Sequence, residues 1–220
     1  MIYASLLKIN DFRNVIGNIK PQDFITTIEL KTYHEFLFIE DKIRMLAARI
    51  LLKSMLENFW STPLDVKALK KDENGKPSLK GLKGLGISHS SEMVAVVIAE
   101  NNLVGIDLQK VGEMTMNDFD FELNSIEKKN FSALNIEAKK KFLYDTWTMK
   151  ESVVKADGIG LMGIKHVKLD RINKVAYYNN KQWYFRKTPY FLNYSVALCS
   201  DNTSYDVMWY NPKNLIFGQL

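Results

Sequence analysis

One long helical pattern stands in each half of the chain, and this duplication limits the fold more than any other feature of the sequence. Residues 40–59 are apolar on nearly every side, which predicts a helix that is mostly buried. Residues 136–156 show a second long pattern after a shorter one at 125–134, and Gly158 stands where a left-handed helix stop is expected. Each half is therefore predicted to fold around its own helix.

Short apolar runs between turn signals predict strands beside both helices. These runs lie at residues 1–8, 85–90, 93–99, 103–108 and within 167–208. The turn signal Asn101-Asn102 separates the two groups of elements. The predicted fold class is therefore α+β in two lobes of similar size, residues 1–101 and 102–220.

The composition is that of a globular protein with an anionic partner. Of 220 residues, 46% are hydrophobic and 25% are charged, which permits a sizeable core. The formal net charge of +5 fits nucleic acid, acidic proteins, anionic lipid or phosphorylated small molecules, or serves solubility alone. Cys199 is the single cysteine, so no internal disulfide can form. No signal peptide or membrane-spanning run is visible, and we expect a cytoplasmic protein without membrane contact.

Residues 104–109 alternate between apolar and other side chains. In a strand, Gly105, Asp107 and Gln109 would share one face, opposite a face directed into the core. A carboxylate and an amide oxygen beside a glycine suit a hard cation, with room for a bulky ligand at the glycine. Taken alone, however, the pattern fits an ordinary edge strand better.

The second long helix carries three charged residues around an apolar seam. Lys150 falls within the apolar arc, so it must reach out or find an anion. Glu151 and Lys155 are an i,i+4 pair, which alone would be a surface salt bridge of ~0.3–0.5 kcal/mol. Together the three residues favour a site for phosphate and metal.

Two further cations could hold an anion. Arg44 shares a helix face with apolar residues and either extends to solvent or meets a phosphate. His89 lies between Ser88 and Ser90 at a predicted strand end, where hydroxyls and a cation suit anion binding. The sequence has no serine–histidine–aspartate hydrolase pattern, glycine-rich nucleotide loop or Walker lysine, which disfavours hydrolases and P-loop enzymes.

Four segments, taken in order, resemble the Sfp-type 4′-phosphopantetheinyl transferases. They are Gly75-Lys76-Pro77, Ile87-Ser88-His89-Ser90, Val104-Gly105-Ile106-Asp107, and Trp147-Thr148-Met149-Lys150-Glu151-Ser152 followed by Lys155, Gly158, Gly160 and Leu161. The resemblance implies a pseudo-dimer of two α+β lobes with coenzyme A in the cleft between them. It also implies magnesium-dependent transfer of phosphopantetheine to a serine of an apo acyl, polyketide or peptidyl carrier protein, with release of adenosine 3′,5′-bisphosphate.

The resemblance also implies a metal site and a set of candidates for the general base. Asp107 and Glu151 would ligate magnesium, with Gln109, where many members of the family have an acid, as an uncharged auxiliary ligand. The proton of the carrier serine would pass to Glu151, to a metal-bound water or to Glu127, and Lys155 could assist the leaving oxygen.

The coenzyme would be held by residues from both halves of the chain. The resemblance gives Ser88 and Lys155 to the pyrophosphate, and His89 and Arg44, the latter matched by position alone, to the 3′-phosphate. Gly75-Lys76-Pro77 would line the adenine side of the coenzyme site. Lys150 is expected at the phosphate site because of its place in the apolar seam of the second long helix.

The sequence is also compatible with two rival functions and contains one candidate docking surface. A coenzyme A-binding protein without transferase activity is the alternative function, while a nucleic-acid-binding module lacks any recognisable motif. We expect a monomer that docks acidic carriers through apolar residues and lysines, unless the apolar residues fold inward. The docking residues would be Met114, Met116, Phe119, Phe121, Lys128, Lys129, Lys139, Lys140 and Lys141.

Overall fold

The computed structural model describes residues 1–12, 16–60, 64–112, 123–186, 188–189, 191, 193–204 and 206–212. The helices and strands of this part of the chain are β1 (Ile2–Lys8), α1 (Thr27–Glu35), α2 (Ile39–Phe59), β2 (Lys70–Lys71), β3 (Pro77–Ser78), β4 (Gly84–Ser90), β5 (Met93–Ala99), β6 (Val104–Lys110), α3 (Ser125–Ser132), α4 (Ile136–Asp157), β7 (Lys168–Asp170), β8 (Val175–Tyr178), β9 (Lys181–Phe185), β10 (Tyr194–Ser200) and β11 (Val207–Tyr210). Short 3₁₀ turns join several of them.

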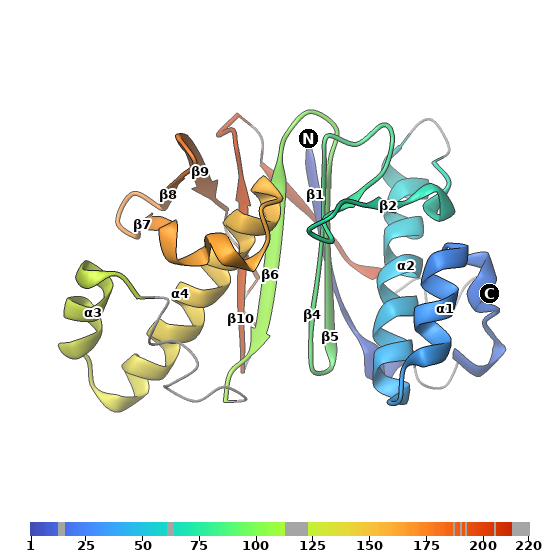
Figure 1. Ribbon diagram of the computed structural model, residues 1–220, viewed down its shortest axis with the longest axis horizontal. Coiled ribbons are helices and arrows are strands. Elements are labelled where there is room, and N and C mark those ends of the chain that lie inside the picture. Colours follow the sequence, from blue (N-terminus) through green and yellow to red (C-terminus); the bar gives the residue numbers. More distant parts are fainter. Residues whose placement is uncertain are drawn as a thin grey trace.

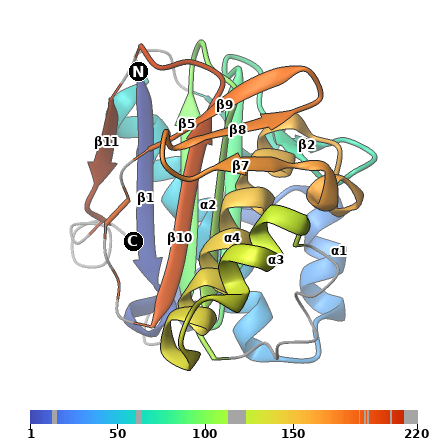
Figure 2. The same cartoon turned by 90° about the vertical axis from the view of Figure 1, so that its left-hand side faces the viewer.

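Two sheets occupy the middle of the molecule, and one long helix covers the outer face of each (Figure 1). The first sheet has the order β11-β1-β5-β4 and packs against α2, and the second has the order β6-β10-β9-β8-β7 and packs against α4. Figure 2 shows α3 and α4 together in front of the second sheet. The predicted α+β class is confirmed.

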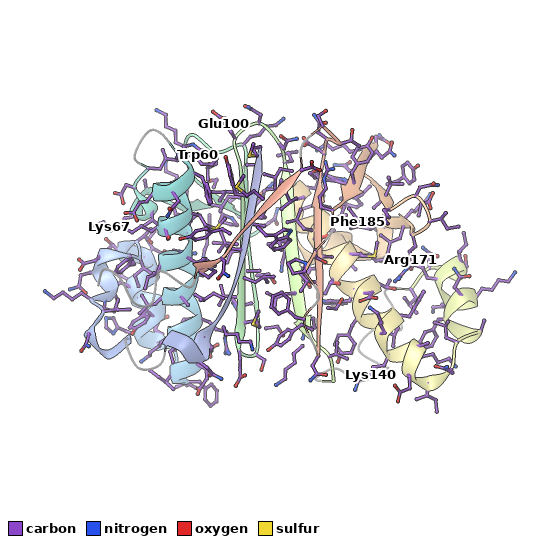
Figure 3. All side chains as sticks on the ribbon, turned by 180° about the vertical axis from the view of Figure 1, so that it is seen from behind. Trp60, Lys67, Glu100, Lys140, Arg171 and Phe185 are labelled. Atoms are coloured by element: carbon purple, nitrogen blue, oxygen red, sulfur yellow. The ribbon has the colours of Figure 1, made fainter. Side chains whose placement is uncertain are left out.

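Strand alternation divides the core into layers. On β1, Ile2 and Ala4 pack between the two sheets, whereas Leu7 faces α2. On β6, Ile106 and Leu108 join the core between the sheets, as the apolar alternation predicted. Figure 3 shows side chains filling the space between the sheets and under both helices.

The two sheets meet along β4 and β6, where side-chain hydroxyls replace a backbone ladder. Ser88 Oγ accepts from the Leu108 amide at 3.3 Å, and Ser90 Oγ accepts from the Lys110 amide at 3.0 Å. A Cβ on Gly84 would lie 2.3 Å from a backbone oxygen of the turn before β6. The close approach of these strands brings their side chains to one site.

Gly105 makes room for a helix rather than for a ligand, which corrects the expectation from the sequence. A Cβ at this position would lie 2.0 Å from the carbonyl oxygen of Ser152 and 2.8 Å from the amide nitrogen of Ala156, both in α4. The absence of a side chain therefore lets α4 lie directly on β6.

Both long helices form where the sequence predicts them, and Gly158 ends α4 with φ +91° in the left-handed region. β11 pairs in parallel with β1, so a strand from the end of the chain completes the first sheet. The division into lobes at residue 101 stays a prediction. None of the helices in the described part of the chain has the length and apolar character needed to span a bilayer.

Candidate active site

Asp107 lies where β6, β4 and α4 meet. It is 2% exposed, and its Oδ1 accepts from Ser88 Oγ at 2.7 Å and from Lys155 Nζ at 2.6 Å. Ser88 comes from β4 and Lys155 from α4, so three elements contribute to one buried polar group. The family resemblance placed all three residues in one site, and the structure brings them together.

Lys155 joins a second carboxylate to this group. Its Nζ lies 3.1 Å from Glu151 Oε1, one helical turn earlier, and 3.2 Å from Ser88 Oγ. Burial would lower the pKa of Lys155, but the carboxylates of Asp107 and Glu151 raise it to about 12. The side chain therefore stays protonated at neutral pH.

One oxygen of the Asp107 carboxyl has no hydrogen-bond partner among the described residues. Burial, partly offset by Lys155, and the charge of Glu151 raise the pKa of Asp107 to about 7. Its Oδ2 is buried and has no hydrogen-bond partner among the residues that the structure describes. Two carboxylates that share one ammonium, with an oxygen still free, form a donor set that fits a hard divalent cation.

Gln109 follows Asp107 by two residues on the same strand and is half-buried. Strand alternation places both side chains on the side of β6 that faces α4. In register, Gln109 lies opposite Ser195 of β10. Its role as an auxiliary metal ligand stays a prediction.

Arg44 and His89 lie near one another beside the turn from β4 to β5. Arg44 Nη1 donates to the Ser91 carbonyl oxygen at 2.9 Å, and its Nη2 donates to Asp41 Oδ1 at 2.5 Å. Desolvation and the nearby cations Arg44 and Lys155 lower the pKa of His89, whose ring is nevertheless exposed. Arg44 therefore carries the positive charge at this surface, and the lowered pKa of His89 favours a neutral imidazole beside it.

A cavity of about 200 Å³ opens beside the carboxylates. Its walls come from both halves of the chain and from the end of α4: Asn74, Gly75, Lys76, Pro77, Leu85, Gly86, Ile87, Glu151, Val154, Lys155, Gly158 and Gly160. The sequence pointed to the glycine-lysine-proline segment and to Glu151 and Lys155. The sequence did not indicate that Asn74 or the apolar residues line this cavity. The turn-rich stretch around Asn74 was the one signal that could have pointed to Asn74.

Lys150 and Glu127 form a separate buried ion pair. Lys150 is fully buried, and its Nζ donates to Glu127 Oε2 at 2.7 Å. The same carboxylate accepts from the amide of Asn124, the N-cap of α3, at 2.8 Å. The buried lysine thus finds an anion, as its place in the apolar arc required, and the pair ties α3 to α4. Neither residue lines the cavity that Glu151 and Lys155 line.

The expected docking surface is only partly described. Met114, Met116, Phe119 and Phe121 lie outside the described residues. Four of the five lysines are exposed, namely Lys128, Lys129, Lys140 and Lys141. The fifth, Lys139, is half-buried, and its Nζ lies 5.3 Å from the centre of the Phe131 ring. The docking role of this region stays a prediction.

Comparison with known proteins gives consistent matches. A family model described as the 4′-phosphopantetheinyl transferase superfamily matches residues 103–205, which include β6 and α4. The chain is 22% identical to the 4′-phosphopantetheinyl transferase psf-1 of Bacillus pumilus over 165 residues, 73% of this chain and 70% of that protein. It is 29% identical to the transferase gsp of Aneurinibacillus migulanus over 133 residues, 60% and 55% of the two chains. It is 25% identical to the transferase Sfp of Bacillus subtilis (strain 168) over 146 residues, 66% and 65%.

Proposed function

We propose that the chain is a member of the 4′-phosphopantetheinyl transferase superfamily, whose model matches residues 103–205, and that it moves the phosphopantetheine arm of coenzyme A onto a serine of an apo carrier protein. The observation that carries the proposal is a connected polar group, in which Glu151 and Lys155 line a cavity and Lys155 contacts the buried Ser88 and Asp107. Two carboxylates and a permanently charged lysine are suited to a pyrophosphate with its counter-cation.

Asp107 and Glu151 would hold magnesium, with Gln109 as an uncharged auxiliary. The free Oδ2 of Asp107 and the position of Glu151 across Lys155 support this assignment. Bound there, magnesium would supply the charge neutralisation that breaking a pyrophosphate requires.

Lys155 and Ser88 would bind the pyrophosphate. The pKa of Lys155, raised to about 12, keeps the ammonium able to donate to a phosphate oxygen throughout the neutral range. Its Nζ stands within hydrogen-bond reach of Ser88 Oγ, whose hydroxyl donates to Asp107, so Ser88 would turn its proton from Asp107 to contact the same phosphate. Arg44 would hold the 3′-phosphate as a cation, and the neighbouring exposed His89 would donate a ring N–H to it.

Glu151 is the better placed of the two carboxylates considered for accepting the serine proton. It lines the cavity, whereas Glu127 is held by Lys150 and by the N-cap of α3. With the proton removed, the serine oxygen would attack the phosphorus that carries pantetheine. Adenosine 3′,5′-bisphosphate would then leave, with Lys155 donating to the departing oxygen.

The proposal includes a cytoplasmic monomer that acts on an acidic carrier. Incubation with coenzyme A, magnesium and a panel of apo carriers tests it directly by mass spectrometry. We expect the carrier to gain the mass of one phosphopantetheine arm and its serine-to-alanine variant to gain none. Coenzyme A binding by calorimetry without any mass gain across the panel would favour the coenzyme A-binding protein instead.

A further inference from the structure

The turn between β2 and β3 is attached to the carboxyl end of α4 by two side chains. Lys76 Nζ donates to the Ala156 carbonyl oxygen at 2.5 Å, and Asn74 Nδ2 donates to the Gly158 carbonyl oxygen at 2.9 Å. Carbonyls at a helix end lack partners within the helix and carry partial negative charge, so a lysine there is stabilising. These bonds join segments that are 80 and 84 residues apart in sequence.

The turn that presents these side chains is held by its own hydrogen bonds. Asp72 Oδ1 accepts from the amides of Asn74 at 3.0 Å and Lys76 at 2.9 Å. The Asp72 amide donates to the Lys76 carbonyl at 3.1 Å, and Gly75 takes φ +81°. An aspartate that caps its own turn in this way fixes the direction of the two side chains that follow.

The two segments also fit closely against one another. A Cβ on Gly158 would lie 2.9 Å from Lys76 Cδ, and one on Gly160 would lie 3.7 Å from Asn74 Cβ. Burial lowers the pKa of Lys76, while Asp157 and Asp72 act against that shift. The lysine stem is therefore packed on the helix end, and its ammonium is already engaged.

This attachment acts on the residues proposed for catalysis. Ala156 follows Lys155 directly, and the turn is continuous with β3, which leads into β4 and Ser88. The turn and the helix end thus close one side of the cavity that Lys155 lines. We propose that Lys76 and Asn74 are positioning residues, which hold the Glu151–Lys155 turn of α4 against Ser88 and Asp107. The inference rests on the proposed function and gives Lys76 a role other than wall of the adenine site.

Hydrogen exchange of the free protein tests the attachment without any substrate. Lys76→Met and Asn74→Ala should each speed amide exchange in residues 154–160 by about fivefold, the effect of losing roughly one hydrogen bond. Lys70→Met, at an exposed lysine of the same hairpin, is the matched control and should leave exchange unchanged. Unchanged exchange in both test variants would overturn the attachment.

Kinetics then separate positioning from ligand contact. Lys76→Met should lower kcat on the order of tenfold, with little change in the KM for coenzyme A, because misplaced catalytic groups slow chemistry. Lys76→Arg, which can still donate to the carbonyl, should restore most of kcat. A raised KM and weaker binding of adenosine 3′,5′-bisphosphate, with normal kcat, would show that Lys76 contacts the nucleotide and would overturn the proposal. If the wild type transfers nothing, the proposed function fails, while the exchange data still decide the attachment.

Discussion

Lys155 of α4 donates to Asp107 of β6 across 2.6 Å, and the same ammonium lies 3.1 Å from Glu151. One ammonium thus pairs with two carboxylates that belong to different elements, and it can balance the charge of only one of them. The i,i+4 spacing of Glu151 and Lys155 would be a minor surface interaction on an isolated helix. Against β6, with Asp107 buried, it becomes part of a site whose electrostatics depend on all three groups.

Removal of either carboxylate should abolish most turnover. Asp107→Asn and Glu151→Gln keep the side-chain shape but remove the charge, and we expect each to lose at least ~100-fold in kcat, as for loss of a main electrostatic stabiliser. Glu137→Gln, at an exposed acid in the first turn of the same helix, is the control. Steady-state kinetics on variants with normal circular dichroism make the measurement. Near-wild-type turnover in either variant would refute the metal assignment.

Gln109 should tune the affinity for magnesium without being essential. Gln109→Glu adds a formal charge on the face of β6 that carries Asp107, so the apparent Kd for magnesium should fall. Gln109→Ala should reduce turnover less than Asp107→Asn does. A magnesium titration of activity, supported by calorimetry, tests this order. An unchanged or weaker affinity in Gln109→Glu would count against a ligand role.

The faces on which these side chains lie could be predicted from local signals, whereas only the resemblance to a known family joined them into one site. Period-two alternation placed Asp107 opposite the core face of β6, and helical spacing placed Glu151 beside Lys155. The partners of distant groups could not be predicted in the same way. The arc around Lys150 showed that it needs an anion but did not indicate Glu127. Nothing in the sequence of the turn at Lys76 indicated that Lys76 contacts the end of α4. Likewise, no local sequence pattern indicated that β11 pairs with β1.

Cys199 should report unfolding through its reactivity. The thiol is fully buried, and burial raises its pKa to about 12. An unfolded chain ionises this thiol at lower pH than the folded protein does. Burial of the Cys199 thiol therefore lowers the free energy of unfolding as the pH rises above the pKa of the thiol in the unfolded chain. At neutral pH it has no such effect. At pH 8, iodoacetamide should label Cys199 only in urea, with a midpoint that follows circular dichroism. Rapid labelling of the folded protein would contradict the buried position.

The exposed lysines of α3 should speed association with the carrier. Lys128 and Lys129 are exposed on α3, and the chain has a formal net charge of +5. If this helix faces an acidic carrier, Lys128→Glu with Lys129→Glu should slow association and flatten its salt dependence, because rim charges act mainly on encounter rates. Affinity for coenzyme A should stay unchanged. Lys67→Glu, at an exposed lysine that Figure 3 places on the opposite side from Lys140, controls for the loss of positive charge. Stopped-flow binding at several ionic strengths measures both effects. Equal slowing by Lys67→Glu, after allowance for the number of charges changed, would show a general effect of net charge and place the docking surface elsewhere.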